Sequence, residues 1–165
     1  VVNWQDNGQE VKTSLTERYP YLNGNLGALV RATEEYFQPH VSWSAVGSGE
    51  PSFREYPPGL IFDAAANALF PPRESTRREL LAILNSSVTT TMLSVLAPTM
   101  NFVVGAIAKL PIILPSTESE VFANTDVLVA NSKADWDSYE RSWDFVGSPL
   151  IAHRSDGVGL AEIVR

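Results

Sequence analysis

The residues of this chain whose types could do chemistry are two histidines, a late pair of glycines and several arginines. His40 and His153 stand alone, without the His/Asp/Glu spacing of a metal site. Gly157-Val158-Gly159 is typical of a loop, and the chain contains neither a phosphate-binding P-loop nor a Gly-x-Ser-x-Gly elbow. We therefore predict no catalytic residue and no metal site, and interpret His40 as a surface or strand-edge histidine.

The stretch from Gly47 to Tyr56 is the best binding candidate, because a Ser/Gly-rich turn between two strands exposes backbone amides. Arg54 and Tyr56 share one face of the second strand, where arginine can read guanine and tyrosine can contact phosphate or stack. The predicted DNA-binding set is Trp43, Ser44, Ser48, Ser52, Arg54, Tyr56, Arg73 and Arg77. The alternative is an ordinary hairpin in which Arg54 is solvated or salt-bridged, with Arg73 and Arg77 on a solvated helix face.

Composition bounds the class of protein. The 165 residues have 44% hydrophobic content, which is typical of a globular protein, and suit one domain or two small lobes. The net charge of −7 alone favours a protein partner over nucleic acid, although a basic face on an acidic body stays open. No apolar run free of charge or proline approaches 18 residues, so we expect no membrane span and no membrane partner. The absence of cysteine excludes disulfides and is compatible with the cytoplasm.

Short strands precede helices, which predicts an α+β fold with a small, mostly antiparallel sheet packed against several helices. The period-two alternation from Val41 to Ala45 indicates a half-buried strand. The other expected strands are 52–56, 60–63 and 67–70, and together they suggest a meander. We also expect a strand end at 1–4, a turn at Asp6-Asn7-Gly8, and short helices at 10–18 and 26–37.

Three capping-box patterns mark the later helices: Thr76 with Glu79, Thr117 with Glu120, and Ser132 with Asp135. The first pattern opens a helix that ends at Ala97-Pro98. Its apolar face consists of Leu80, Leu84, Val88, Met92 and Val95. Asn85-Ser86-Ser87 is expected to kink or split this helix. Residues 102–104 and 110–114 look strand-like. The second pattern opens a helix to about residue 131, and the third a final helix.

An aromatic face on that final helix carries Trp136, Tyr139 and Trp143. Such a face could stack bases, but the neighbouring carboxylates would repel phosphates, so we interpret it as packing onto the body of the protein.

Several blocks, in order along nearly the whole chain, resemble the BREX/Pgl-type (PglX-like) adenine-specific DNA methyltransferases of phage-defence systems. They are Val1 to Gly8, Val41 to Ser44 with Pro51 to Arg54, Pro58 to Asp63, Leu84 to Ser86, Pro98 to Ile112, and Ser132 to Tyr139 with Ser142 to Phe145. Asp135-Trp136-Asp137-Ser138 followed by Ser142-Trp143-Asp144-Phe145 is the most unusual of them. The chain begins mid-pattern without Met, as an excised fragment would.

The resemblance implies a target-recognition region like those of type I/IIG restriction-modification enzymes, at residues 1–145, followed by a loop or linker at 146–165. The catalytic domain would precede it and bind S-adenosylmethionine, leaving no cofactor in this fragment. Double-stranded DNA would be the partner, together with other phage-defence proteins, in the cytoplasm. The alternative function is a non-catalytic, acidic protein-interaction module; a self-contained hydrolase is disfavoured because no nucleophile–base pair is present.

Two positions depart from the family pattern. Glu50 stands where a basic residue is expected, which argues against a phosphate contact by that turn, and Ala106 stands where an acid is common. Within the Asn101-to-Ile112 segment only Lys109 is charged, so we interpret the segment as scaffold beneath the strands rather than as a surface that reads bases.

Overall fold

The computed structural model describes residues 2–63, 65–114 and 119–152. The chain divides into two compact units, Val1–Ile113 and Leu114–Arg165, and each is described by itself. The assignment of 1–145 to target recognition and 146–165 to a linker stays a prediction.

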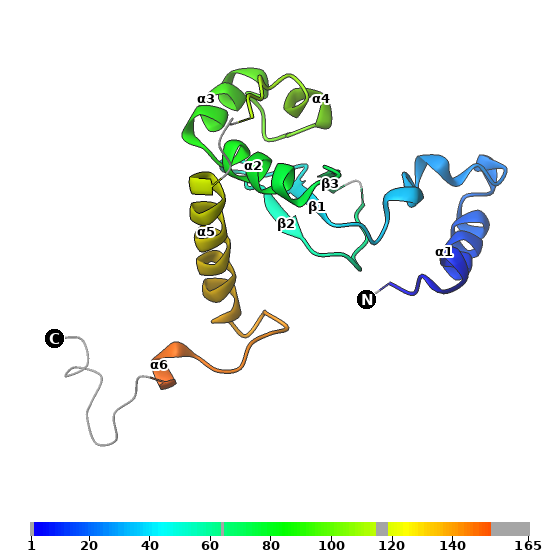
Figure 1. The fold of residues 1–165 in the computed structure, drawn as a ribbon. Helices are drawn as coiled ribbons and strands as arrows, with labels where there is room; N and C mark the ends of the chain where they lie inside the picture. The colour runs from blue at the N-terminus through cyan, green and yellow to red at the C-terminus, as the bar shows by residue number, and fades with distance from the viewer. Residues whose placement is uncertain (1, 64, 115–118, 153–165) are drawn as a thin grey trace. The chain divides into compact units, whose positions relative to one another are not determined.

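The elements are drawn in Figure 1. The helices are α1 (Gln5–Arg18), α2 (Glu74–Leu84), α3 (Ser87–Leu96), α4 (Val104–Ile107), α5 (Ser119–Asp137) and α6 (Pro149–Ala152). The strands are β1 (His40–Ser44), β2 (Arg54–Tyr56) and β3 (Ala66–Leu69), and short 3₁₀ turns occupy Pro20–Leu22, Leu26–Ala28 and Thr33–Glu35.

The three strands form one antiparallel sheet in the order β2-β1-β3, which confirms the α+β class. The meander order was wrong, because β1 is central and β3 pairs with its other edge. The strand expected at 60–63 does not form. Instead, the Asp63 carboxylate accepts from the backbone amides of Ala65 and Ala66, at 2.8 and 3.1 Å, and turns the chain into β3.

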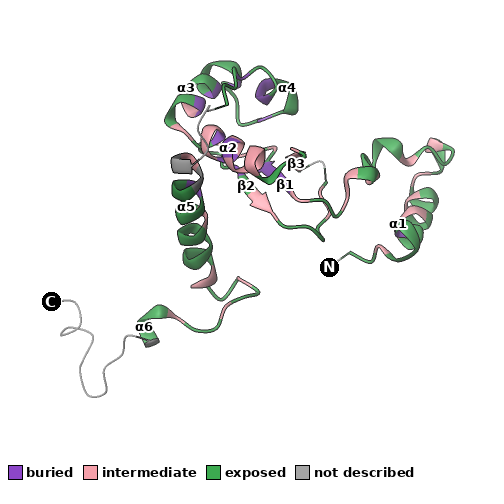
Figure 2. Cartoon of the chain, viewed as in Figure 1, coloured by how far each residue is buried: buried purple, intermediate pink, exposed green. Residues whose placement is uncertain are grey.

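The central position of β1 explains a second difference from the sequence pattern. His40 through Trp43 are all buried, whereas the alternation predicted only every second residue inside (Figure 2). The side chains of His40 and Ser42 on the polar face are therefore interior, and the prediction of a surface or edge His40 was wrong. The His40 imidazole, 3% exposed, stacks on Tyr56 at 5.3 Å between ring centres.

The break at Asn85-Ser86-Ser87 is confirmed, since α2 and α3 meet there at a bend of 69°. The Ser86 hydroxyl caps α3 by accepting from the Thr89 amide. The first capping box was wrong: α2 begins at Glu74, two residues before Thr76, with Arg73 at the N-cap and no side-chain cap. Among the described helices none is by itself long and apolar enough to cross a membrane, and the bent pair α2–α3 meets that test only jointly, by length and composition.

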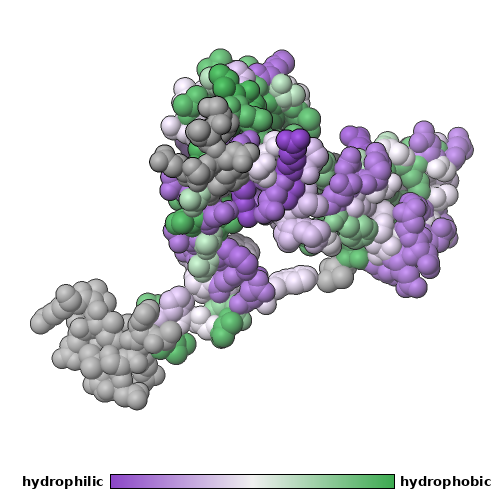
Figure 3. Space-filling model, in the orientation of Figure 1, coloured by the Kyte–Doolittle hydropathy of each residue, from purple (hydrophilic) through white to green (hydrophobic). Residues whose placement is uncertain are grey.

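The bend also breaks up the apolar face predicted from Leu80 to Val95. Leu84 and Leu93 are buried at 1%, but Val88 and Val95 are 61% and 76% exposed. Figure 3 shows hydrophobic side chains gathered on the surface over α3 and α4. The end of α3 before Pro98 is confirmed, with Ala97 as the C-cap.

The segment after Pro98 is not strand-like as expected. Asn101 makes one isolated bridge with Val46, the helix α4 follows, and residues 110–114 have no regular structure. Near the N-terminus, the helix expected at 26–37 is replaced by 3₁₀ turns, with Ala32 and Phe37 at positive φ. The predicted turn at Asp6-Asn7-Gly8 is confirmed, since all three residues have positive φ within α1.

The second unit contains one long helix where two were predicted. α5 runs through Asn131 and Ser132 to Asp137, so the third capping box does not start a helix. Both side chains are exposed there, and nothing removes a backbone hydrogen bond at that point. Thr117 lies outside the described residues.

The Asn85 side chain joins the helices to the sheet. Its Oδ1 accepts from the Phe53 amide and its Nδ2 donates to the Phe53 carbonyl, both at 3.0 Å, while Nδ2 also donates to the Leu81 carbonyl at 2.9 Å. The amide thus pairs with the backbone of Phe53 as a neighbouring strand would. Phe53 itself is 3% exposed and packs on Trp43 at 5.5 Å.

Replacing Asn85 by Ala should lower the free energy of unfolding by about 2 kcal/mol, because three hydrogen bonds are lost and the Phe53 backbone is left without its partners. Chemical denaturation followed by tryptophan fluorescence measures this. The matched control is Asn25→Ala, an exposed asparagine outside this contact, which should change stability by less than about 0.5 kcal/mol. Equal effects of the two substitutions would contradict the role of Asn85.

Candidate nucleic-acid interface

The loop between β1 and β2 is held at both ends. At the β1 end, the Gly47 amide donates to the Met100 carbonyl at 3.0 Å and the Phe102 amide donates to the Ala45 carbonyl at 2.8 Å. At the β2 end, Asn85 binds both backbone groups of Phe53. The residues between these anchors, 48–52, therefore project from a fixed base.

A small cavity of about 160 Å³ opens beside this loop. Its lining residues are Ser44, Val46, Gly47, Glu50, Pro51, Ser52, Arg54 and Phe102. Three members of the predicted DNA-binding set, Ser44, Ser52 and Arg54, are thus brought together, and all three are exposed. Ser48 is exposed on the same loop but does not line the cavity.

Because side chains alternate between the two faces of strand β2, Arg54 and Glu55 lie on opposite faces. Glu55 points away from the face of Arg54, and its carboxylate pairs with Arg77 at 3.2 Å and with Arg78. The Arg77 side chain is only 11% exposed, and its guanidinium also donates to the Pro71 carbonyl at 3.4 Å. Arg77 therefore connects α2 to the sheet and is not available at the surface.

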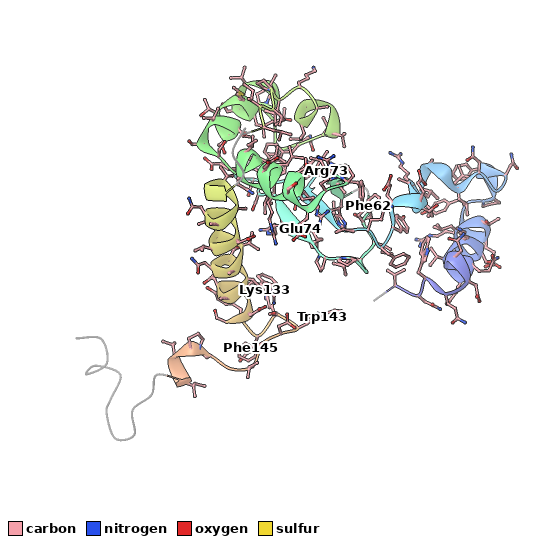
Figure 4. All side chains as sticks on the ribbon, in the orientation of Figure 1. Phe62, Arg73, Glu74, Lys133, Trp143 and Phe145 are labelled. Atoms are coloured by element: carbon pink, nitrogen blue, oxygen red, sulfur yellow. The ribbon has the colours of Figure 1, made fainter. Side chains whose placement is uncertain are left out.

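The remaining predicted residues occupy different environments. Trp43 is 2% exposed and its indole N–H donates to the Phe102 carbonyl at 2.7 Å, so this side chain belongs to the core. The Tyr56 ring is half-buried against His40. Arg73 is exposed at the start of α2 (Figure 4). The surface-accessible part of the predicted set is Ser44, Ser48, Ser52, Arg54 and Arg73.

Sequence reasoning left Glu50 out of the binding set because its charge opposes a phosphate contact. The structure places it in the lining of the cavity together with Arg54. Their spacing of four residues across a turn was the available signal, but their common place in the cavity could be seen only once the loop was folded.

In the second unit, Lys133 organises the end of α5. Its ammonium group donates to Asp137 at 2.6 Å and to Asp144 at 2.7 Å, and the Ser142 hydroxyl also donates to Asp137 at 2.6 Å. The hydrogen bonds from Lys133 and Ser142 lower the pKa of Asp137, and those to the two carboxylates raise the pKa of Lys133. The Asp-Trp-Asp and Ser-Trp-Asp blocks are thus linked through this lysine. Figure 4 labels Lys133 and Trp143 in this part of the chain.

The aromatic side chains of these blocks are not packed within their own unit. Trp136 and Tyr139 are 56% and 57% exposed, and Trp143 is 90% exposed. Trp136, Tyr139 and Phe145 line an open hollow of about 580 Å³. The packing of this face onto the body of the protein stays a prediction.

Among the described residues, no group of three His, Cys, Asp or Glu side chains is placed to hold a metal ion. His153 and Gly157 to Gly159 lie outside those residues.

The fold and the loop together define a small α+β module with a fixed, polar, surface-exposed loop as its candidate site. No protein-family profile matches the chain. It is 30% identical over 158 residues to the adenine-specific methyltransferase PglX of Lacticaseibacillus casei (strain Zhang), an alignment that covers 93% of this chain and 12% of that protein. It is 29% identical over 158 residues to the adenine-specific methyltransferase BrxX of Escherichia coli O9:H4 (strain HS), covering 94% and 12%.

The chain is therefore homologous to a segment of the PglX and BrxX adenine-specific methyltransferases, as the sequence blocks predicted. It spans about an eighth of the length of these relatives.

We expect Ser142→Ala to raise the pKa of Asp137 toward its ordinary value, because one of the hydrogen bonds that favour the carboxylate is lost. A carbon-detected NMR titration of the carboxyl group measures the midpoint. Folding lowers this pKa, so the stabilisation is complete above the pKa of the unfolded carboxyl and is lost as the pH falls through the lower, folded value. Ser138→Ala is the control, since that hydroxyl donates to the Asp135 carbonyl instead. An Asp137 titration midpoint that Ser142→Ala leaves unchanged would contradict the hydrogen bond between these two residues.

Proposed function

We propose that this chain is the DNA target-recognition part of an adenine-specific DNA methyltransferase of a BREX-type phage-defence system, working in the cytoplasm. The observation that supports it most is the homology to PglX and BrxX over nearly the whole chain but only 12% of their length. The rest of such an enzyme has room for a separate catalytic domain. The fold would then serve as a recognition domain like those of restriction-modification enzymes.

In this proposal the parent enzyme flips the target adenine out of the duplex while this chain reads neighbouring base pairs. S-adenosylmethionine would supply the methyl group from the catalytic domain. The residues of this chain do not fit that cofactor, because it has no Asn-Pro-Pro-aromatic turn, and the Gly47-Ser48-Gly49 turn after β1 leads into the antiparallel strand β2 instead of into a helix.

The distribution of charge supports the first unit as the part that meets DNA. Of the net charge of −7, the first unit has eight Lys/Arg against ten Asp/Glu, a net −2, and the second has four against nine, a net −5. Phosphates are repelled less by the first unit. Its exposed Arg54 and Arg73, with the hydroxyls of Ser44, Ser48 and Ser52, supply donors suited to phosphate and base edges.

The second candidate function is a protein-interaction module, and the second unit carries the observation that favours it. Its acidic charge accompanies aromatic side chains that are largely exposed, Trp136 and Trp143 among them. Exposed aromatics are enriched in protein interfaces. Other phage-defence proteins are the partners we propose for this surface.

We expect the 165-residue chain to bind duplex DNA with an affinity that falls steeply as salt rises, since phosphate contacts release counterions. Arg54→Ala should weaken binding at least about tenfold. Fluorescence anisotropy over a series of salt concentrations measures both the affinity and its salt dependence.

Arg31→Ala is the matched control, because it removes the same charge from an exposed arginine whose Nε donates to its own segment, at the Ala28 carbonyl. It should change affinity far less than Arg54→Ala. Absence of salt-dependent DNA binding by the unmodified chain would favour the protein-interaction module and sink the DNA-recognition proposal.

A further inference from the structure

We propose that Glu50 and Arg54 together read one G·C base pair in the major groove, with Arg54 on guanine and Glu50 on the paired cytosine. This inference rests on the proposed DNA-recognition function and names the base pair that the cavity beside the β1–β2 loop selects.

Both side chains line the same cavity of about 160 Å³ and keep their charges available. Neither forms an ion pair with any residue that the structure describes, although Arg77 and Arg78 are both paired with Glu55 one strand position away. Arg54 is exposed because alternation along β2 turns it away from that cluster. The structure thus separates one arginine and one glutamate from the charges that hold the fold together.

The carboxylate restricts what the cavity can accept. A glutamate on a DNA-facing surface is repelled by phosphates and by the acceptor atoms of guanine and thymine, so it is tolerated only where it meets a donor. In the major groove the donors are the amino groups of cytosine and adenine. Adenine presents its N7 acceptor beside that amine, which repels a carboxylate, whereas cytosine presents no acceptor there. Cytosine N4 is therefore the matching partner for Glu50.

The arginine is complementary to the other half of the same pair. Arg54 can donate two hydrogen bonds to guanine O6 and N7, the most frequent specific contact in protein–DNA complexes. Guanine O6 and cytosine N4 are hydrogen-bonded to each other, about 3 Å apart, so two side chains from one small cavity can reach both. Opposite charges on adjacent groups also lessen the cost of removing either from water.

The loop that carries Glu50 is already held in place before any base pair is bound. The hydrogen bonds of Gly47 to Met100 and of Phe53 to Asn85 fix its two ends, and Phe102, 6% exposed, forms an apolar wall of the cavity. A loop already held in place loses little conformational entropy on binding, and this favours discrimination between bases.

The experiment selects bound duplexes from a randomised library with the 165-residue chain and its variants. The unmodified chain should enrich one G·C pair. Glu50→Gln should lose the preference for cytosine at that position by about tenfold or more, since glutamine can also bind adenine. Arg54→Gln should lose the guanine preference to a similar extent, because glutamine pairs with adenine instead of guanine. Glu34→Gln and Arg31→Gln, exposed substitutions of the same kinds elsewhere in the first unit, should leave the enriched sequence unchanged.

A second measurement uses only the unmodified chain, so it is independent of any folding defect in the variants. A duplex with 7-deazaguanine at the enriched position removes the N7 acceptor and should bind several-fold more weakly than the guanine duplex. Selected duplexes without a G·C preference, or a preference that the 7-deazaguanine and both variants leave intact, would overturn this inference and leave the DNA-recognition proposal standing. Failure to retain any duplex would overturn both.

Discussion

The side chain of Asn85 is the contact on which the candidate site depends. One amide ends helix α2 by bonding to the Leu81 carbonyl and pairs with both backbone groups of Phe53. A backbone donor and acceptor that would otherwise need water or a strand are satisfied by a side chain from a different element. The position of the β1–β2 loop is therefore set by the end of a helix 32 residues further along the chain.

The second constraint is the alternation of side chains in a sheet whose central strand is covered. On one face, Glu55 forms ion pairs with Arg77 and Arg78, and these connect α2 to β2. On the other face, Arg54 remains accessible at the edge of the cavity. Such half-buried ion pairs need both partners present, since a charge left alone in a low-dielectric setting is costly. One strand of three residues thus separates a stabilising cluster from a surface available for recognition.

Much of the local structure followed from residue types. The turn at Asp6-Asn7-Gly8, strand β1, the break at Asn85-Ser86 and the end of α3 before Pro98 were all predicted, because each depends on short-range backbone chemistry. The misplaced elements were those decided by distant partners. Strand 60–63 gave way to the Asp63 turn, and the apolar face across α2 and α3 was broken up by a 69° bend whose size the sequence did not indicate.

By itself the sequence determined the α+β class, the homology to adenine-specific methyltransferases and the presence of an exposed Ser/Gly-rich loop ahead of Arg54. Only the tertiary structure decided which of the predicted residues are accessible. Trp43 became core because its indole bonds to Phe102, Arg77 was taken up by Glu55, and Glu50 came to share a cavity with Arg54. The physical reason is that periodicity specifies which side of its own strand a residue faces, whereas burial and charge pairing depend on the elements packed against that side.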